Sequence, residues 1–156
     1  METSILAVGD ITPVTDIATE TDRHSLAPHD GKKMVIFFFP RADTSSCTKE
    51  SIQFSDLIED FAAAGAEVIG ISKDNPEKQS KFRAKHDLKC HLGADHNTDV
   101  CEQFGVWVEK SMYGRSYMGI QRAIFVIDAT GKIVAVWPKV TADGHAAEVL
   151  AFVQTI

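Results

Sequence analysis

The chain has 156 residues, 22 acidic and 16 basic, which gives a formal charge of −6. Hydrophobic residues make up 44% and charged residues 24%, the balance of a globular protein that buries a core without disulfide staples. Three cysteines argue against a disulfide-rich scaffold, the lack of a ~20-residue apolar run argues against a membrane protein, and the acidic balance argues against nucleic acid as a partner. We therefore expect a cytoplasmic protein with reduced thiols.

The first third of the chain predicts an extended leader and one buried strand. Residues 9–31 are rich in turn-forming residues, and Val14 and Ile17 are expected to lie against the body in an edge strand or hairpin. Residues 34–39 are apolar at every position, which is typical of a strand buried on both faces. Pro40 ends this strand because proline cannot donate to a sheet ladder.

Helices and strands then alternate. Apolar residues recur at helical spacing over 54–62, and residues 67–72 predict a second strand. Asn75 followed by Pro76 predicts the start of a mostly polar helix over about 76–86.

The last third of the chain predicts shorter elements. They are, in chain order, a strand near Leu92, a helix over 98–104, a polar loop that contains Gly114 and Gly119, a β-hairpin of strands 123–127 and 132–137, and a helix over 145–153. The order of elements predicts an α/β fold, a three-layer sandwich with a central mixed sheet flanked by helices. We expect residues 1–156 to form a single domain.

Cys47 is the main candidate for chemistry. It lies where the buried strand passes into an amphipathic helix, and ligands of α/β sheets gather beyond the carboxyl ends of the strands. Free N–H groups in the first turn of a helix favour a thiolate over a thiol. Most unpaired cysteines are inert core residues, but Cys47 has Ser, Thr and Lys as neighbours rather than apolar residues. These features predict a reactive thiol.

The spacing Pro40-x-x-x-Thr44-x-x-Cys47 resembles the active-site signature of the peroxiredoxins. Other segments are similar to the peroxiredoxin Q branch, also called the bacterioferritin comigratory proteins, and these are residues 38–40, 47–50, 68–72, 100–107, 109–114 and 119–122. The similarity runs from about Gly9 to the C-terminus. It implies a thioredoxin-like fold and a thiol-dependent peroxidase for hydrogen peroxide and small organic hydroperoxides, with no cofactor and no metal.

The resemblance also implies a role for each residue of the signature. Cys47 would attack a peroxide oxygen and become a sulfenic acid. Thr44 would turn its hydroxyl toward the sulfur and the incoming peroxide, and Pro40 would shield the site. Arg122, in a strand beside the cysteine, would donate hydrogen bonds to the thiolate and to the peroxide oxygens.

The sequence departs from much of that family in its second cysteine. Many members carry a resolving cysteine five residues after the first, where this chain has Ile52, or on the next helix around 81–85, where no cysteine occurs. Cys90, expected at the edge of a strand and more mobile, remains a candidate resolving thiol, whereas Cys101 is expected in the core. The leading prediction is a one-cysteine mechanism, in which thioredoxin, glutaredoxin or glutathione reduces oxidised Cys47.

Alternatives remain open at this point. Cys90 would resolve Cys47 in an atypical two-cysteine peroxidase, or Cys47 would act only as a switch in a non-catalytic redox sensor or binding module. The lysine-rich stretch over 73–89 is expected to be a solvated helix face, with the docking of an acidic reductase as the alternative. The resemblance implies a monomer, with a dimer as the second option.

Overall fold

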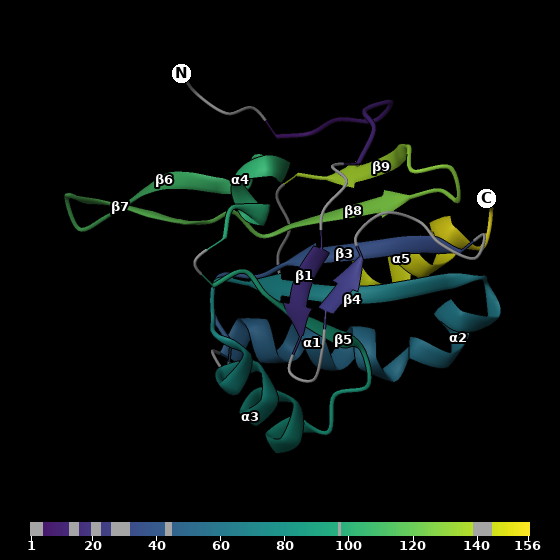
Figure 1. Ribbon diagram of the computed structural model, residues 1–156, viewed down its shortest axis with the longest axis horizontal. Coiled ribbons are helices and arrows are strands. Elements are labelled where there is room, and N and C mark those ends of the chain that lie inside the picture. The colour runs from purple at the N-terminus through teal and green to yellow at the C-terminus, as the bar shows by residue number, and fades with distance from the viewer. Residues whose placement is uncertain are drawn as a thin grey trace.

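A seven-stranded mixed sheet forms the centre of the molecule (Figure 1). The computed structural model describes residues 5–12, 16–19, 23–25, 32–42, 45–96, 98–138 and 145–156. The strands of the sheet are β1 (Asp16–Thr19), β2 (Arg23–Ser25), β3 (Lys33–Phe38), β4 (Ala66–Ser72), β5 (His91–Ala94), β8 (Ala123–Ile127) and β9 (Ile133–Trp137). Their order is β2-β1-β5-β4-β3-β8-β9, in which β4 pairs in parallel with both β3 and β5 and the other pairs are antiparallel.

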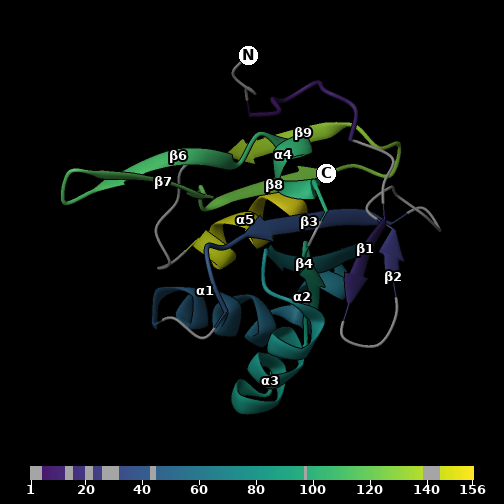
Figure 2. The same ribbon diagram turned by 60° about the vertical axis from the view of Figure 1, so that its left-hand side comes forward.

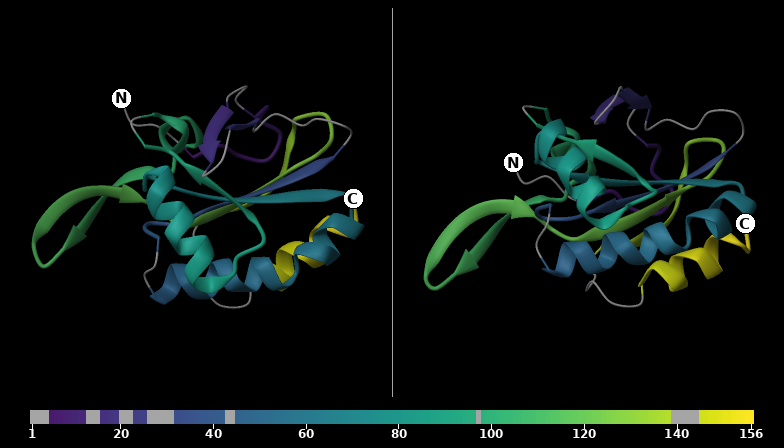
Figure 3. Two further views of the ribbon diagram at one scale, coloured as in Figure 1. Left: turned by 60° about the horizontal axis from the view of Figure 1, so that its bottom comes forward. Right: turned by 90° about the horizontal axis from the view of Figure 1, so that it is seen from below.

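Helices cover both faces of this sheet (Figures 1 and 3). One face packs against α1 (Ser45–Asp56), α2 (Ile58–Ala63), α3 (Pro76–His86) and α5 (His145–Val153), and the other against α4 (Val100–Phe104). This arrangement confirms the predicted α/β sandwich with a central mixed sheet. Within the described residues, no helix combines the length and apolar character that crossing a membrane requires.

Strand β3 separates two hydrophobic clusters, because successive side chains of a strand point to opposite faces. Phe37 points toward α1, where its ring stacks on Phe54 at a centroid separation of 4.4 Å. Phe38 points toward α4, with its ring centroid 5.2 Å from that of Phe104. Every residue over 34–39 is at most 2% exposed, which confirms the prediction of a strand buried on both faces.

The helix predicted over 54–62 is divided at Leu57. The N–H of Leu57 donates to the carbonyl of Phe54 at 3.2 Å, and this i to i−3 bond tightens the chain between α1 and α2. Helix α3 begins as predicted, with the side chain of Asn75 accepting a hydrogen bond from the N–H of Lys78 at 2.8 Å.

The largest difference from the sequence prediction is a second, two-stranded sheet. β6 (Trp107–Met112) and β7 (Arg115–Ile120) pair antiparallel where the polar composition predicts a loop. Tyr113 and Gly114 have φ of 53° and 77°, the geometry of a two-residue hairpin turn. Most of β7 is exposed, so the strands lack the buried alternating face that reveals a strand in a sequence. The hairpin extends away from the body (Figures 1 and 2).

The two ends of the chain agree with prediction where they are described. Strands β8 and β9 form the expected hairpin, and α5 occupies the expected range. Near the N-terminus β1 and β2 form an antiparallel edge pair in which Ile17 is 1% exposed. Val14 lies outside the described residues.

Candidate active site

Cys47 lies in the first turn of α1, just beyond the carboxyl end of β3. The residue is 1% exposed and packs in the hydrophobic cluster between the sheet and α1. The chain that leads to it is anchored to the end of β4, since the N–H of Ala42 donates to Oδ2 of Asp74 at 2.7 Å. The hydroxyl of Ser72 donates to the same oxygen at 2.6 Å. These bonds fix the start of the connection between β3 and the helix that carries the thiol.

Arg122 brings a guanidinium group to this thiol. It lies in the two-residue link between β7 and β8, immediately before the strand in which the resemblance placed it. Its Nη2 donates to Sγ of Cys47 at 3.1 Å, and its Nη1 donates to Oε1 of Glu50 at 2.7 Å. Cys47 and Glu50 are three positions apart in α1 and therefore share one face of the helix. One guanidinium thus spans the thiol and a carboxyl group.

Burial affects the charge states of both Glu50 and Arg122. Burial raises the pKa of Glu50 to about 7, and the attraction of Arg122 offsets only part of that effect. Its second oxygen, Oε2, is buried and has no hydrogen-bond partner in the described part of the chain. Burial opposes the charge of Arg122, but Glu50 and Cys47 outweigh it and raise the pKa of the guanidinium. Arg122 therefore stays charged, while the carboxyl group titrates near neutral pH.

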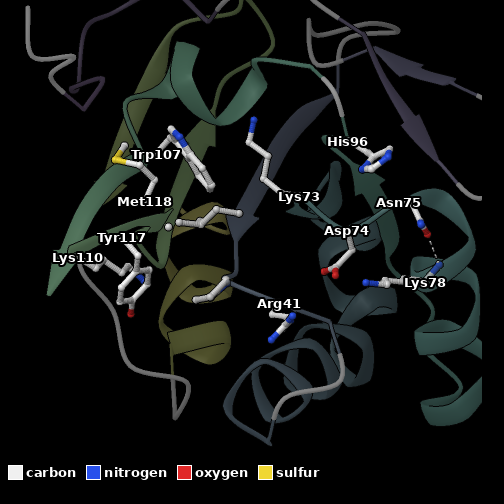
Figure 4. Close-up of a pocket in the computed structure, with 13 residues that line it drawn as sticks. Arg41, Lys73, Asp74, Asn75, Lys78, His96, Trp107, Lys110, Tyr117 and Met118 are labelled. Atoms are coloured by element: carbon white, nitrogen blue, oxygen red, sulfur yellow. Dashed lines mark hydrogen bonds between the residues drawn. The ribbon is translucent and has the colours of Figure 1, made fainter. Parts of the chain in front are cut away.

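A cavity of about 560 Å³ lies beside this site (Figure 4). Its walls are formed by the segments that follow β3, β4 and β5 and by the β6–β7 hairpin, at the carboxyl edge of the parallel strands. Pro40 lines the cavity next to the link toward Cys47. Lys110 lines it from the hairpin, and burial together with the nearby Arg122 lowers the pKa of this lysine. Cys47 and Arg122 do not line the cavity themselves, and Lys110 is the lining residue on which their charges act.

Cys90 directly precedes β5, as predicted, but it is fully buried rather than accessible at an edge. It belongs to the same hydrophobic cluster as Cys47. Arg83 clamps the backbone around it, donating from Nη2 to the carbonyl of Cys90 and from Nη1 to the carbonyl of Leu88, each at 2.7 Å. Burial raises the pKa of Cys90 to about 12, despite the nearby charge of Arg83.

Cys101 is fully buried in α4, which confirms its prediction as a core residue. It belongs to the cluster on the opposite face of the sheet from Cys47. Its N–H donates to Oδ2 of the buried Asp95 at 2.8 Å. Burial and the charge of Asp95 raise the pKa of the Cys101 thiol. All three cysteines are free.

The structure brings Cys47, Arg122 and Pro40 to one region, while Thr44 lies outside the described residues. Sequence reasoning gave no role to Glu50 or to Asp74. The signal for Glu50 is its i+3 spacing from Cys47, which places a carboxyl group on the same helix face as the thiol. No local pattern marks Asp74, because its contact with Ala42 joins segments 32 positions apart.

The family of the chain follows from comparison with known proteins. The model of the AhpC/TSA family matches residues 8–136. The chain is 43% identical to a putative peroxiredoxin of Coxiella burnetii, over 93% of this chain and 97% of the relative. It is 39% identical to the peroxiredoxin Bcp of Escherichia coli K12, over 90% of each.

Solved structures agree with these relatives. The bacterioferritin comigratory protein of Xanthomonas campestris, a protein with alkyl peroxide reduction activity, superposes with a TM-score of 0.89 at 32% identity, covering 96% of this chain and 97% of its own. A cysteine-to-serine mutant of PrxQ from Xylella fastidiosa gives a TM-score of 0.91 at 29% identity, covering 97% and 98%.

The chain belongs to the AhpC/TSA family of thioredoxin-like proteins. Its relatives place it in the peroxiredoxin Q, or Bcp, branch, and it is a peroxidase.

Proposed function

We propose that Cys47 is the peroxide-attacking thiol of this peroxidase and that Arg122 stabilises the charge that develops on sulfur and oxygen. The contact of 3.1 Å between Nη2 of Arg122 and Sγ of Cys47 carries this proposal. In the first step the Cys47 thiolate attacks the terminal oxygen of a hydroperoxide, and the O–O bond breaks. The sulfur becomes a sulfenic acid, and the departing oxygen takes a proton to leave as an alcohol or as water.

Ionisation of the thiol alone does not explain a fast reaction. A free thiol, with a pKa near 8.5, is already a few per cent ionised at neutral pH, so complete ionisation gains about 30-fold. Donors that are fixed in place before the reaction supply the larger effect, because they meet negative charge without reorganising. The guanidinium of Arg122 is such a donor, since its second nitrogen is held by the buried Glu50.

Two further residues have roles in this proposal. Pro40, at the cavity wall, shields the thiol and removes one competing N–H donor. Thr44 points its hydroxyl at the sulfur and the peroxide, as the family signature implies. The substrates are hydrogen peroxide and small organic hydroperoxides, in keeping with the alkyl peroxide reduction of the Xanthomonas relative.

We further propose a one-cysteine mechanism. An external thiol attacks the sulfenic sulfur and releases water, and a second thiol then frees Cys47 as the donor is oxidised to a disulfide. The burial of Cys90, its raised pKa and the clamp by Arg83 all oppose attack on Cys47 from within the chain. For Cys101 the sheet itself stands between the two sulfurs. Thioredoxin, glutaredoxin and glutathione are the candidate donors.

The lysine-rich stretch over 73–89 is a candidate docking surface for a protein that reduces Cys47. Lys73, however, already makes contacts that stabilise the fold. It forms ion pairs with Asp95 at 3.1 Å and Glu102 at 2.5 Å, and its Nζ lies 5.1 Å from the ring centroid of Trp107. We propose that the chain works in the cytoplasm, where free thiols persist, as a single-domain monomer over residues 1–156.

The test is peroxide turnover with a reductant in excess. Wild type is expected to consume many equivalents, Cys47→Ser none, and Cys90→Ala as many as wild type. After one equivalent of peroxide without reductant, intact mass should rise by about 16 Da, the sulfenic acid. A loss of about 2 Da that Cys90→Ala abolishes would show an internal disulfide and overturn the one-cysteine mechanism. Consumption of a single equivalent by wild type would favour a redox sensor.

A further inference from the structure

One guanidinium lies between two acidic side chains in a site that is almost closed to water. Arg122 donates from Nη2 to Sγ of Cys47 at 3.1 Å and from Nη1 to Oε1 of Glu50 at 2.7 Å. Only 12% of the Arg122 side chain and 2% of the Glu50 side chain are exposed, and Cys47 is 1% exposed. A single buried cation offsets a single negative charge, because a second anion would lose its hydration without gaining a counterion.

Among the described residues, Arg122 is the one counterion of Glu50. The sheet and α5 contribute apolar side chains to the cluster that they form with α1. The ionisable residues at the start of α5, His145 and Glu148, lie 3.4 Å from each other. The charge of Lys110 on β6 acts on Arg122, but burial and Arg122 are what shift the pKa of Glu50. The charge of Glu50 therefore depends on what else Arg122 has to neutralise.

The second oxygen of Glu50 suits a proton better than a negative charge. Oε1 accepts the bond from Arg122, whereas Oε2 is buried and has no hydrogen-bond partner in the described part of the chain. Ionisation would leave negative charge on this unpartnered oxygen, and protonation turns it into a hydroxyl, which costs less to bury. While Cys47 is a thiolate, Arg122 already faces one negative charge, and this favours the protonated form of Glu50 further.

We propose that Glu50 stores the proton of the reaction: it is protonated while Cys47 is a thiolate and ionised once Cys47 is a sulfenic acid. The S–O bond forms and the O–O bond breaks; the departing oxygen takes one proton, and Glu50 gives one up. Oxidation removes the thiolate charge, so Arg122 then pairs with the Glu50 carboxylate alone. Cys47 and Glu50 together keep one negative charge throughout, and the solvent supplies no net proton. This inference rests on Cys47 being the peroxide-attacking thiol, and Glu50 acts through Arg122 without touching the peroxide.

The experiment counts the protons taken from solution when one equivalent of hydrogen peroxide oxidises the protein without a reductant. An indicator dye in weak buffer measures the uptake, the ultraviolet absorbance of the thiolate shows that the sulfur is ionised beforehand, and intact mass shows the added oxygen. Below the pKa of Glu50, which is about 7, wild type should take up almost no proton, and uptake should rise toward one above it. Glu50→Gln keeps an oxygen that can accept the bond from Arg122 but stores no proton. It should take up close to one proton at every pH at which its thiolate is present.

Infrared difference spectra follow the same proton in wild type alone. Oxidation should remove the C=O band of a protonated carboxyl group and add carboxylate bands, and Glu50→Gln should lack this change. Glu77→Gln removes a carboxyl group that is 77% exposed on α3 and should keep the uptake and the spectrum of wild type. Equal uptake by wild type and Glu50→Gln, a carboxyl band that oxidation leaves unchanged, or a wild type without thiolate below the pKa of Glu50 overturns the inference. A wild type that gains no oxygen on Cys47 overturns the proposed function instead.

Discussion

At the scale of single residues, the site depends on a carboxyl group that does not touch the sulfur. Glu50 holds Nη1 of Arg122, so the second nitrogen is left in position to meet Cys47. Arginine suits this arrangement because its planar group presents several donors in fixed directions on separate nitrogens, whereas the donors of a lysine all lie on one rotatable ammonium nitrogen. Glu50 is therefore a positioning residue, and its burial has a measurable consequence for stability.

The pKa of Glu50 predicts how stability changes with pH. Burial raises it from the ordinary value of 4.5 to about 7, so between these values the unfolded chain has released a proton that the native chain still holds. The free energy of unfolding therefore falls as pH rises through this window, by about 3 kcal/mol for this group, and levels off above it. Urea unfolding of wild type and Glu50→Gln at a series of pH values should show this contribution as the difference between the two stability curves, since all other groups are shared by both proteins.

The control for this experiment is an exposed glutamate. Glu77→Gln on α3, where the side chain is 77% exposed, should leave the wild-type slope unchanged. Parallel stability curves for wild type and Glu50→Gln would contradict the assigned shift.

At the scale of elements, α1 is supported by a tight contact between two parallel strands. Phe37 of β3 lies opposite Gly70 of β4, and a Cβ at Gly70 would collide with the ring of Phe37. That ring is stacked on Phe54 of α1, the helix that also contains Cys47 and Glu50. Because Gly70 has no side chain, the Phe37 ring lies close to the sheet. The position of this ring in turn sets the distance between α1 and the sheet.

Gly70→Ala is expected to lower the free energy of unfolding by about 1–3 kcal/mol, because the added methyl group must displace the Phe37 ring. Urea unfolding measures the loss. The smaller side chain of Phe37→Leu should make the alanine less harmful, so the double variant should be more stable than the sum of the two single losses predicts. Strict additivity would show that the ring is not what the methyl group meets.

The sequence predicts those elements that bury a regular face. β3 is apolar throughout, and the Asn75 cap starts α3 at the expected residue. The β6–β7 hairpin was not predictable in this way, because its strands are largely exposed and no alternation marks them. The residues of the site also differ in how far the sequence predicts them. The position of Cys47 follows from the local pattern, but its contact with Arg122 spans 75 positions and only the family resemblance suggested it.

At the scale of the whole molecule, the sheet separates Cys101 from the other two cysteines. Cys47 and Cys90 belong to the cluster between the sheet and α1, and Cys101 belongs to the cluster on the opposite face. Cys90 and Cys101 are protected by the global fold rather than by a local loop.

Alkylation by iodoacetamide should therefore distinguish the three thiols. Cys90 and Cys101 are expected to react only through global unfolding, so their labelling rates in urea should rise with the slope of the unfolding free energy. Cys47 is only 1% exposed but lies in the first turn of α1, so it should react in the absence of denaturant through local opening of that turn, as followed by mass analysis of peptides. Native labelling of Cys90 at the rate of Cys47 would contradict this prediction and return the two-cysteine mechanism to consideration.

The long separation between Cys47 and Arg122 also matters while the protein is being made. At about 5–20 residues per second, roughly 4–15 s pass between the synthesis of the sulfur and that of the guanidinium which contacts it. A nascent chain that ends before this arginine has the thiol of a free cysteine, without the donor that we propose to accelerate its oxidation. If Arg122 has this role, the order of residues along the chain delays the sensitivity of Cys47 to peroxide until translation has passed β7, and a growing chain is spared premature oxidation.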